Sequence, residues 1–524
     1  MAHSCIDASR RTFRIMMSAF ALLAAAGCAS IPDLQPGPPS QARPADPNAP
    51  LARRYANGDH PGQSGFALVG EGGDAFSMRV AMIEQARHTL DLQYYIIRPD
   101  DTGHYLISKL IEAAQRGVRV RLLVDDIYTA GHEMDMAELA SHSNIDVRVF
   151  NPFMGRDAVG ISRMLEFIVN SDRVNRRMHN KLFIADNSAV LFGGRNLGNE
   201  YFSSPSNISF VDLDVFASGP IVQDISRSFD EYWNNELAIP LGQLASMPNE
   251  KAQRKALAEL ATQVRAFEQS QQFRDLKTNG RFPEGLPRKG DLSWARSRAV
   301  WDNPRKAQPP TDEEHDDRIG AVVQRVVDRA QREVLLISPY FVPGDEGVTR
   351  MADLRRRGVS VSVLTNSLAA NDVPAVHAGY ARYREPLLRE GAALYELRPL
   401  RKPPRTRIFR IPTGSTASLH AKALVVDNQT IVIGSANADP RSRFLNTEFA
   451  VVIYSGELAA QLTRSFARLT QPDVSYRVML RGDQLHWLGK GDDGAVDLTN
   501  EPEASGWRRF MSSVYGVIAP ESML

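Results

Sequence analysis

Apolar residues recur with two different periods along the chain, and these periods predict helices alternating with strands. Helical spacing marks 80–85 and 107–116, whereas 90–97 and 118–124 have the length and character of strands. Alternation of this kind is typical of a mainly parallel sheet covered by helices on both faces. We therefore expect an α/β fold. A further amphipathic helix is predicted over 251–267, packed on the protein rather than inserted in a membrane.

The sequence also repeats itself. The segment HNKLFIADNSAVLFGGRN begins at His179 and HAKALVVDNQTIVIGSAN begins at His420, an offset of 241 residues that also relates RGVRVRLLVDD to RGVSVSVLTN. An offset of 244 relates Ala86 to Ala330, which one short gap explains. Two copies of one α/β unit therefore lie in tandem, and duplicated lobes commonly pair about a pseudo-two-fold axis.

Each copy carries the same polar residues at the same spacing: a histidine, then a lysine, an aspartate, a glycine and an asparagine. Apolar strings flank each aspartate and predict two strands joined by a tight turn. We expect each histidine and its lysine, two residues apart, to share one face of the first of these strands. The repeated residues are His179, Lys181, Asp186 and Asn196 in the first copy and His420, Lys422, Asp427 and Asn437 in the second.

A site that combines both copies suits a phosphodiester. Lys181 and Lys422 would neutralise the non-bridging oxygens, and Asn196, Asn437 and Ser435 would donate hydrogen bonds to them. One imidazole would attack phosphorus and form a phosphohistidine, while the other protonates the leaving alcohol. The second imidazole would then deprotonate the acceptor, which is water or an alcohol.

No metal or other cofactor is needed for this chemistry, because the lysines supply the positive charge. The sequence contains no HExxH or CxxC pattern. Asp125 and Asp126 are adjacent and would point to opposite faces of a strand, which favours a strand-end or capping role over a metal pair.

Two further carboxylates follow the motifs at similar places, Asp212 in FVDLDVFA and Glu448 in NTEFAVVI. A nucleophilic imidazole needs an acceptor on its other nitrogen, so we predict that these two residues orient the histidines. The alternative is a surface carboxylate at a strand edge. Asp186 and Asp427 complete the repeated catalytic motif, but their place at the turn favours fixing the hairpin and lobe contacts over proton transfer.

The repeated residues, together with Gly193 and Gly434, match HxKx4Dx6Gx2N twice, and the chain thereby resembles the phospholipase D superfamily from about residue 70 to its end. The surroundings of both motifs, and the string AVWDNPRK, are most similar to bacterial cardiolipin synthases of the C type. This resemblance implies a phosphatidyltransferase that moves a phosphatidyl group from a donor phospholipid to histidine and then to phosphatidylglycerol, giving cardiolipin. It also implies that His179 is the nucleophile and His420 the acid and base, an assignment that the symmetry of the sequence leaves open.

Two other activities use the same residues. A phospholipase D with water as acceptor would release phosphatidic acid, and the motifs do not separate it from a transferase. A periplasmic nuclease would need a basic groove, but 62 Lys and Arg face 61 Asp and Glu, so no nucleic acid partner is expected. Locally, six basic residues lie in the segment from Arg398 to Arg410. They indicate either a site that binds anionic headgroups or a solvated loop.

The N-terminus has the features of a targeting signal. Three arginines precede an apolar run at 15–27, which is shorter than the about 20 residues of a membrane span but suits a signal peptide. The residues AAG before Cys28 resemble a bacterial lipobox, with Ala25 in place of the usual Leu. We expect Cys28 to carry lipid, with an ordinary secretory peptide as the alternative. Ala29 then favours the outer membrane over the inner, with the protein facing the periplasm.

Length and composition agree with this organisation. A chain of 524 residues, 43% hydrophobic and 23% charged, can bury a large core, and its two cysteines are too few for a disulfide framework. We expect two tandem phospholipase D-like lobes, each a mainly parallel mixed sheet flanked by helices, related by a pseudo-two-fold axis around one shared active site. The predicted parts are a signal peptide at 1–27, a Pro-rich tether at 28–60, a first lobe at 61–245, a helical connection and linker at 246–312, a second lobe at 313–475 and a C-terminal extension at 476–524.

Overall fold

The computed structural model describes residues 34–56, 58–127, 133–155, 166, 170–202, 208–278, 285–309, 317–400, 416–491, 494–518 and 520–521. One compact unit, Pro36–Leu524, contains both predicted lobes. The predicted signal peptide, Cys28 and the basic segment at 401–410 lie outside the described residues. Within the described ranges, no helix is long and apolar enough to cross a membrane.

The first lobe is built on three parallel strands, β2 (Thr89–Tyr94), β3 (Arg119–Asp125) and β4 (Ile145–Phe150). Antiparallel strands extend the sheet on both sides of this centre. Helices α3 and α4 pack on one face and α8 on the other, because apolar residues alternate between the two faces of the strands. The remaining bounds are α3 (Gly72–Gln85), α4 (Asp101–Gln115), α5 (Glu133–Ala140), α8 (Ile221–Trp233), β1 (Ser64–Val69), β5 (Leu182–Ala185), β6 (Ala189–Gly193), β8 (Asp214–Ser218) and β9 (Ala238–Pro240).

The second lobe has the same strand order as the first. Its parallel centre is β11 (Glu333–Ile337), β12 (Ser360–Asn366) and β13 (Ala393–Leu397). Antiparallel strands again complete the sheet, and helices cover its faces. The other bounds are β10 (Ser293–Trp301), β15 (Ala423–Val426), β16 (Thr430–Gly434), β17 (Phe449–Tyr454), β18 (Ser475–Arg481), α11 (Arg318–Asp328), α12 (Gly344–Arg356), α13 (Pro374–Ala381), α14 (Arg384–Arg389) and α16 (Gly456–Leu469).

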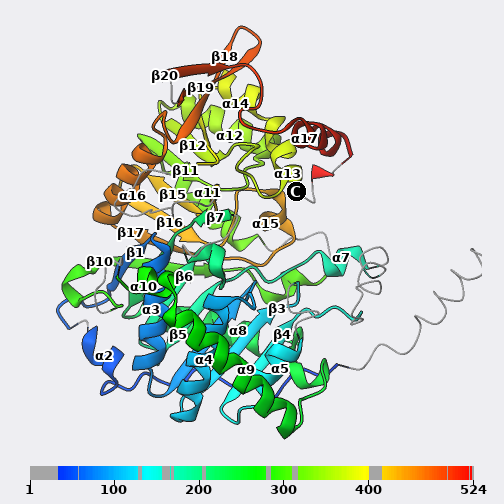
Figure 1. Ribbon diagram of the computed structural model, residues 1–524. Coiled ribbons are helices and arrows are strands. Elements are labelled where there is room, and N and C mark those ends of the chain that lie inside the picture. The colour runs from blue at the N-terminus through cyan, green and yellow to red at the C-terminus, as the bar shows by residue number, and fades with distance from the viewer. Residues whose placement is uncertain are drawn as a thin grey trace, which may run out of the picture. The chain divides into compact units, whose positions relative to one another are not determined.

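The strand orders confirm the predicted α/β class and the duplication. The first lobe reads β9-β4-β3-β2-β5-β6-β8-β1 and the second reads β18-β13-β12-β11-β15-β16-β17-β10. Since β1 pairs with β10, a single sheet runs through both lobes, which lie one above the other in Figure 1. Each half of this sheet is mixed, with parallel pairing confined to the three strands that helices connect.

Both predicted hairpins are present. Asp186 and Asn187 have φ values of 50° and 48°, and Asp427 and Asn428 have φ values of 54° and 53°, the left-handed pair that a tight two-residue turn requires. We expected each histidine and its lysine to lie on the first strand of the hairpin, and this prediction is wrong by a few residues. His179 and Lys181 precede β5, and their counterparts precede β15, because their backbone bonds to the other lobe instead of to a neighbouring strand.

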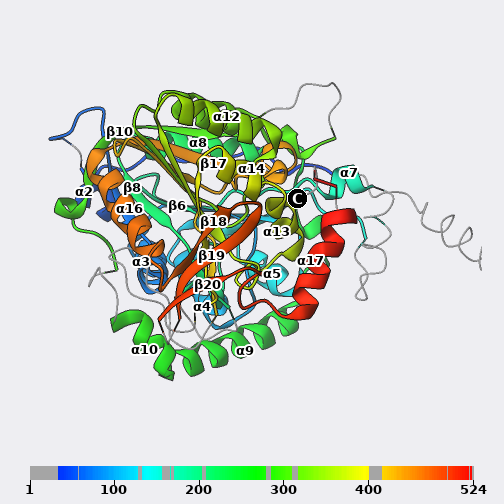
Figure 2. The same cartoon turned by 90° about the horizontal axis from the view of Figure 1, so that it is seen from above.

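The predicted amphipathic helix is confirmed as α9 (Glu250–Gln269), and it packs on the first lobe with α10 (Gln271–Thr278), along one margin of the molecule in Figure 2. Phe267 is buried, and its ring centroid lies 5.8 Å from that of Tyr105 on α4. Within the predicted connection and linker at 246–312, Pro304–Ala307 form a helical turn in which Lys306 is buried in an ion pair with Asp302.

Two predicted peripheral segments also belong to the compact unit. From Pro36 the expected tether packs on the first lobe, where α2 (Pro50–Arg54) brings Leu51 into the core and Ser40 N–H donates to Asn234 Oδ1. The expected C-terminal extension continues the sheet, because β18 pairs with β13 as β9 pairs with β4. It ends in β19 (Gln484–Gly491), β20 (Gly494–Leu498) and α17 (Gly506–Ile518).

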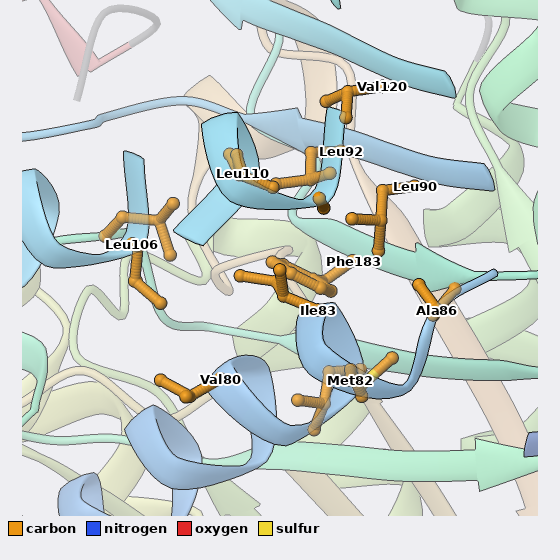
Figure 3. Close-up of a cluster of buried hydrophobic side chains, with 14 of the residues drawn as sticks. Val80, Met82, Ile83, Ala86, Leu90, Leu92, Leu106, Leu110, Val120 and Phe183 are labelled. Carbon is orange, nitrogen blue, oxygen red and sulfur yellow. The ribbon is translucent and has the colours of Figure 1, made fainter. Parts of the chain in front are cut away.

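The space between the first-lobe sheet and its helices α3 and α4 is filled by side chains. Figure 3 shows Val80 and Ile83 from α3 and Leu106 and Leu110 from α4 gathered near Phe183 of β5. All of these side chains are buried, as close packing of a core requires.

Candidate active site

A short two-stranded parallel sheet joins the lobes at the motifs. It pairs β7 (Ile208–Val211) of the first lobe with β14 (Thr416–Leu419) of the second. β7 lies between the two halves of the molecule in Figure 1. His420 follows β14 directly, and its N–H donates to Val211 O at 2.8 Å. A matching bond runs from His179 N–H to Thr447 O at 2.9 Å. Each histidine is thus anchored to the other lobe by its own backbone.

The two predicted carboxylates contact the histidines, and the contacts are crossed. Glu448 of the second lobe accepts from Nδ1 of His179, with its two oxygens at 2.9 and 3.0 Å. Asp212 of the first lobe accepts from Nδ1 of His420 at 2.5 Å. The crossing follows from the backbone bonds, because Val211 and Thr447 immediately precede the two carboxylates. In both imidazoles Nε2 is the nitrogen left for chemistry.

Both lysines of the motif are buried beside the histidines. Lys181 Nζ donates to His179 O at 2.5 Å and lies 5.2 Å from the centre of the Tyr95 ring. Lys422 Nζ donates to His420 O at 2.6 Å and lies 3.2 Å from Nε2 of the same imidazole. Burial lowers the pKa of both ammonium groups, and Glu448 and Asp212 oppose that shift. A bound phosphate would oppose it further, because it adds negative charge.

Glu448 is held by two hydroxyl groups that the first lobe does not match. Ser435 Oγ donates to its Oε2, and Ser442 Oγ donates to its Oε1 at 2.9 Å. The residue that corresponds to Ser435 is Gly194, where a Cβ would collide with Oδ1 of Asp212. Glycine therefore lets Asp212 approach in one copy, and serine fixes Glu448 in the other. Ser435, which we expected to face the phosphate, is buried against Glu448 instead.

The two carboxylates consequently differ in acidity. Burial raises the pKa of Glu448 to about 7, against the charge of Lys181. Burial also raises the pKa of Asp212, but His420 and Lys422 outweigh it and lower the pKa to about 2. The pKa values of the two histidines are also affected differently by their surroundings. Burial and the two lysines hold the pKa of His179 well below its usual value, whereas Asp212 opposes the lowering at His420.

The two motif asparagines have different surroundings. The amide of Asn196 is engaged within its own lobe, since its oxygen accepts from Ile96 N–H at 3.2 Å and its nitrogen donates to Tyr201 OH at 2.9 Å. Asn437 Oδ1 is buried and has no hydrogen-bond partner among the described residues. Of the two, Asn437 is the one whose amide retains hydrogen-bonding capacity for a ligand.

The motif aspartates lie away from the histidines. Asp186 accepts from the backbone N–H groups of Arg87, His88 and Thr89 at the start of β2, and Asp427 makes the same three bonds ahead of β11. Seven residues of extended chain separate each aspartate from its histidine, roughly 20 Å. Neither aspartate is placed to transfer protons with the substrate, in agreement with their position at the turn.

The adjacent pair Asp125 and Asp126 has a similar structural place. Asp125 accepts from Met178 N–H at 2.9 Å, and Asp126 accepts from Phe153 N–H at 2.7 Å. Over the described part of the chain, no cluster of three or more His, Cys, Asp or Glu side chains is arranged to hold a metal ion.

Some residues at the site were not predicted from the sequence. Ser442 lies at the offset of 241 from Tyr201, and both contact the site: Ser442 through Glu448, and Tyr201 through the His420 ring, at a centroid distance of 5.5 Å. The alignment of the two segments that follow the motifs, at the offset of 241, was the signal that could have identified them. Asp302 is a second case, since it accepts from Glu448 N–H and from Lys306 Nζ.

Comparison with known proteins agrees with this geometry. The family described as "Cardiolipin synthase, PLD-like domain" matches residues 80–233 and 323–470. Cardiolipin synthase C of Escherichia coli (strain K12) is 40% identical over 89% of this chain and 97% of its own length. Cardiolipin synthase of Geobacillus kaustophilus (strain HTA426) is 25% identical over 80% and 69%, respectively.

A solved structure shows the same fold. Phosphatidylserine synthase of Haemophilus influenzae Rd KW20 superposes with a TM-score of 0.55 at 14% identity, covering 90% of this chain and 100% of that chain. With the duplicated strand order, the paired motifs and the matched residues all in agreement, this chain belongs to the cardiolipin synthase family with phospholipase D-like domains.

Proposed function

We propose that the protein is a phosphatidyltransferase that makes cardiolipin by moving a phosphatidyl group from a donor phospholipid to phosphatidylglycerol. The observation that supports it is the crossed two-histidine site in a chain 40% identical to Escherichia coli cardiolipin synthase C. Such a site offers one imidazole on each side of a phosphodiester, with a lysine beside each.

In the first step, Nε2 of His179 attacks phosphorus while its Nδ1–H remains bonded to Glu448. The bond between phosphorus and the oxygen of the leaving alcohol breaks, and that oxygen takes a proton from Nε2 of His420. Lys181, Lys422 and Asn437 face the non-bridging oxygens. The products are a phosphatidyl group on His179 and a neutral His420.

In the second step, Nε2 of His420 removes the proton from a hydroxyl of phosphatidylglycerol. The oxygen attacks phosphorus, and the bond between phosphorus and His179 breaks. Cardiolipin leaves, and His420 again carries the proton that the next cycle needs. No net proton is gained or lost, as a transfer between two alcohols requires.

The asymmetry of the site supports this assignment of roles. The lowered pKa of His179 keeps its imidazole neutral, which a nucleophile needs. Burial and Lys422 lower the pKa of His420 as well, but the ionised Asp212, whose pKa is about 2, opposes that lowering and so supports the protonated form that a general acid needs. Reversing the roles would place the acid beside Glu448, the weaker counter-ion.

The same proposal places the protein at a membrane. Lipid on Cys28 would hold it there, facing the periplasm and with the outer membrane favoured. The supporting features are the lipobox-like AAG before Cys28 and the apolar run of signal-peptide length. A phospholipid substrate suits this location.

Product analysis tests the activity. Purified protein is incubated with phosphatidylglycerol, alone and with phosphatidylethanolamine, and the lipids are separated. Cardiolipin is the expected product. Phosphatidic acid without cardiolipin would show a hydrolase, and nicking of plasmid DNA without lipid turnover would show a nuclease.

A further inference from the structure

The second lobe contains an apolar pocket of about 440 Å³ that begins at the proposed active site. This size lies within the range of ~300–1,000 Å³ for ligand pockets. Its walls are the outer face of the sheet and the two helices above it. Six of the apolar side chains that line it are Val323 and Val327 of α11, Leu336 of β11, Met351 and Leu354 of α12, and Val432 of β16.

In the first lobe, aromatic and aliphatic side chains of the described residues fill the matching space. The Phe76 ring on α3 packs 5.6 Å from the rings of Tyr105 and Phe202, and Leu197 is buried beside them (Figure 3 shows the neighbouring side chains). The repeat offsets of 244 and 241 relate three of these residues to pocket-lining positions. Phe76 corresponds to Gly320, Leu197 to Ala438 and Phe202 to Arg443. At these three positions the second lobe thus carries a smaller or a charged side chain.

One end of the pocket belongs to the catalytic motif. Lys422 and Asn437 both line it, and the Lys422 ammonium and the Nδ2 amide group of Asn437 are hydrogen-bond donors of the kind that a phosphate oxygen needs. From there the pocket follows β11 away from the site as far as Val334, which is paired with Val361 of β12. The four residue-to-residue steps from Ser338 to Val334 span about 13 Å.

Charged side chains surround the pocket where it meets solvent. Arg443 bonds to Glu346 at 2.7 Å and to Asp317 at 3.1 Å, and Arg350 bonds to Glu346 at 3.1 Å. All four residues line the pocket. The pocket thus has a polar rim, an apolar interior and one end suited to phosphate. These features suit an amphiphile whose hydrocarbon chain begins next to a phosphate.

We infer that this pocket binds one acyl chain of the phosphatidyl group that is transferred. The inference rests on the proposed function, since it takes the phosphate of that group to lie against Lys422 and Asn437. Among the described residues of the first lobe, side chains fill the equivalent space, so the donor phospholipid would be held by the second lobe. The enzyme would then prefer long-chain donors over short-chain ones because of apolar burial.

A matched pair of substitutions on α11 tests the inference. Val323→Phe places a ring in the pocket, whereas Val326→Phe makes the same change on the same helix at a residue that does not line it. We expect Val323→Phe to lower kcat/KM for dioleoyl-phosphatidylglycerol by about tenfold or more, with dibutyroyl-phosphatidylglycerol changed by less than about twofold. Val326→Phe is expected to leave both values near wild type. Equal effects of Val323→Phe on the two lipids, or no effect on the long-chain lipid, would overturn the inference.

Photo-crosslinking of the wild-type protein gives a readout that needs neither turnover nor a folded variant. The probe is phosphatidylglycerol with a diazirine near the end of one acyl chain, and adducts are located by mass spectrometry. Adducts at Val327 and Val361 are expected. Adducts confined to exposed residues such as Trp507 would overturn the inference. If the wild-type protein converts no lipid, the proposed function fails, and the position of the adducts still decides whether the pocket holds an acyl chain.

Discussion

Nδ1 of His179 lies 2.9 Å from Oε2 of Glu448, although 269 positions of sequence and the boundary between two repeats separate the residues. The contact between His420 and Asp212 is its counterpart in the opposite direction. Each lobe therefore supplies one histidine together with the carboxylate that contacts the histidine of the other lobe. The chemistry depends on the contact between the lobes as much as on the motifs.

Removal of either imidazole is expected to stop turnover. His179→Ala and His420→Ala should each lower kcat by about a thousandfold or more, because one removes the nucleophile and the other the proton donor. Cardiolipin formation is measured with circular dichroism as a check on folding. His486→Ala, which changes a histidine on β19, is the matched control and should keep near-normal activity. Substantial turnover by either active-site variant would exclude the two-imidazole mechanism.

The pH profile should report Glu448. Protonation of this carboxyl, whose pKa is about 7, weakens its hold on Nδ1–H of His179, so kcat/KM should fall as the pH decreases through about 7. Glu448→Gln should be slower by about 10²–10⁴-fold and should lose this limb of the profile. Asp212→Asn should also be slow but should retain the limb, since the pKa of Asp212 is about 2. A limb that survives in Glu448→Gln would assign it to another group.

Asp302, which forms a buried ion pair with Lys306, accepts a hydrogen bond from the backbone N–H of Glu448. Lys306 Nζ lies 2.7 Å from Asp302 Oδ2, and both side chains are at most 3% exposed. Lys306→Met leaves a carboxylate buried without its partner and should lower the free energy of unfolding by about 3–5 kcal/mol. The double variant Lys306→Met with Asp302→Asn should recover much of that loss. Denaturant unfolding measures both, and a double variant no more stable than the single one would contradict the pairing.

The motif aspartates should affect stability more than catalysis. Asp186→Ala removes the acceptor of three backbone N–H groups and should lower the free energy of unfolding by about 2–4 kcal/mol. Asp427→Ala should cost less, because water can reach Gln331 and Arg332. For both variants we expect kcat per folded molecule within about twofold of wild type, since neither side chain reaches the histidines. A folded variant with kcat reduced a hundredfold would show that these aspartates take part in catalysis.

The anchor prediction concerns the mature N-terminus. Intact-protein mass spectrometry should find a chain that begins at Cys28 and carries the added mass of lipid. Cys28→Ser should release the protein from the membrane fraction without changing its activity on detergent-solubilised lipid. A mature chain that begins elsewhere, with no added mass, would instead support the ordinary secretory peptide.

Sequence reasoning was strongest where the chain repeats. The offset of 241 predicted the two lobes, the hairpins and the gathering of both motifs, because a duplicated sequence folds into duplicated topology. Asp212 and Glu448 were identified by their similar places after the two motifs, but the sequence did not predict that each contacts the histidine of the other lobe. That crossing depends on the parallel pairing of β7 with β14, which joins segments about 200 residues apart and has no periodic signal.

Other features were hidden for different physical reasons. Ser442 supports Glu448 from the short helix Pro440–Phe444, where a single serine carries no pattern of its own. The region after Pro36 has the composition of a spacer, yet its backbone finds partners such as Asn234 on the first lobe. Composition describes what a segment could do alone, whereas packing depends on the surface that it meets.

The pairing of β7 with β14 also makes the proposed reaction depend on the contact between the lobes. Asp212 and His420 stand directly after these strands, so any hinge motion that parted the lobes would break the ladder and release both imidazoles from their carboxylates at once. In such an opened molecule, the proposed nucleophile and the proposed acid would lose their orienting carboxylates at the same time. In the proposed mechanism, a phosphorylated histidine would thus meet its acceptor only while the ladder between the lobes is intact.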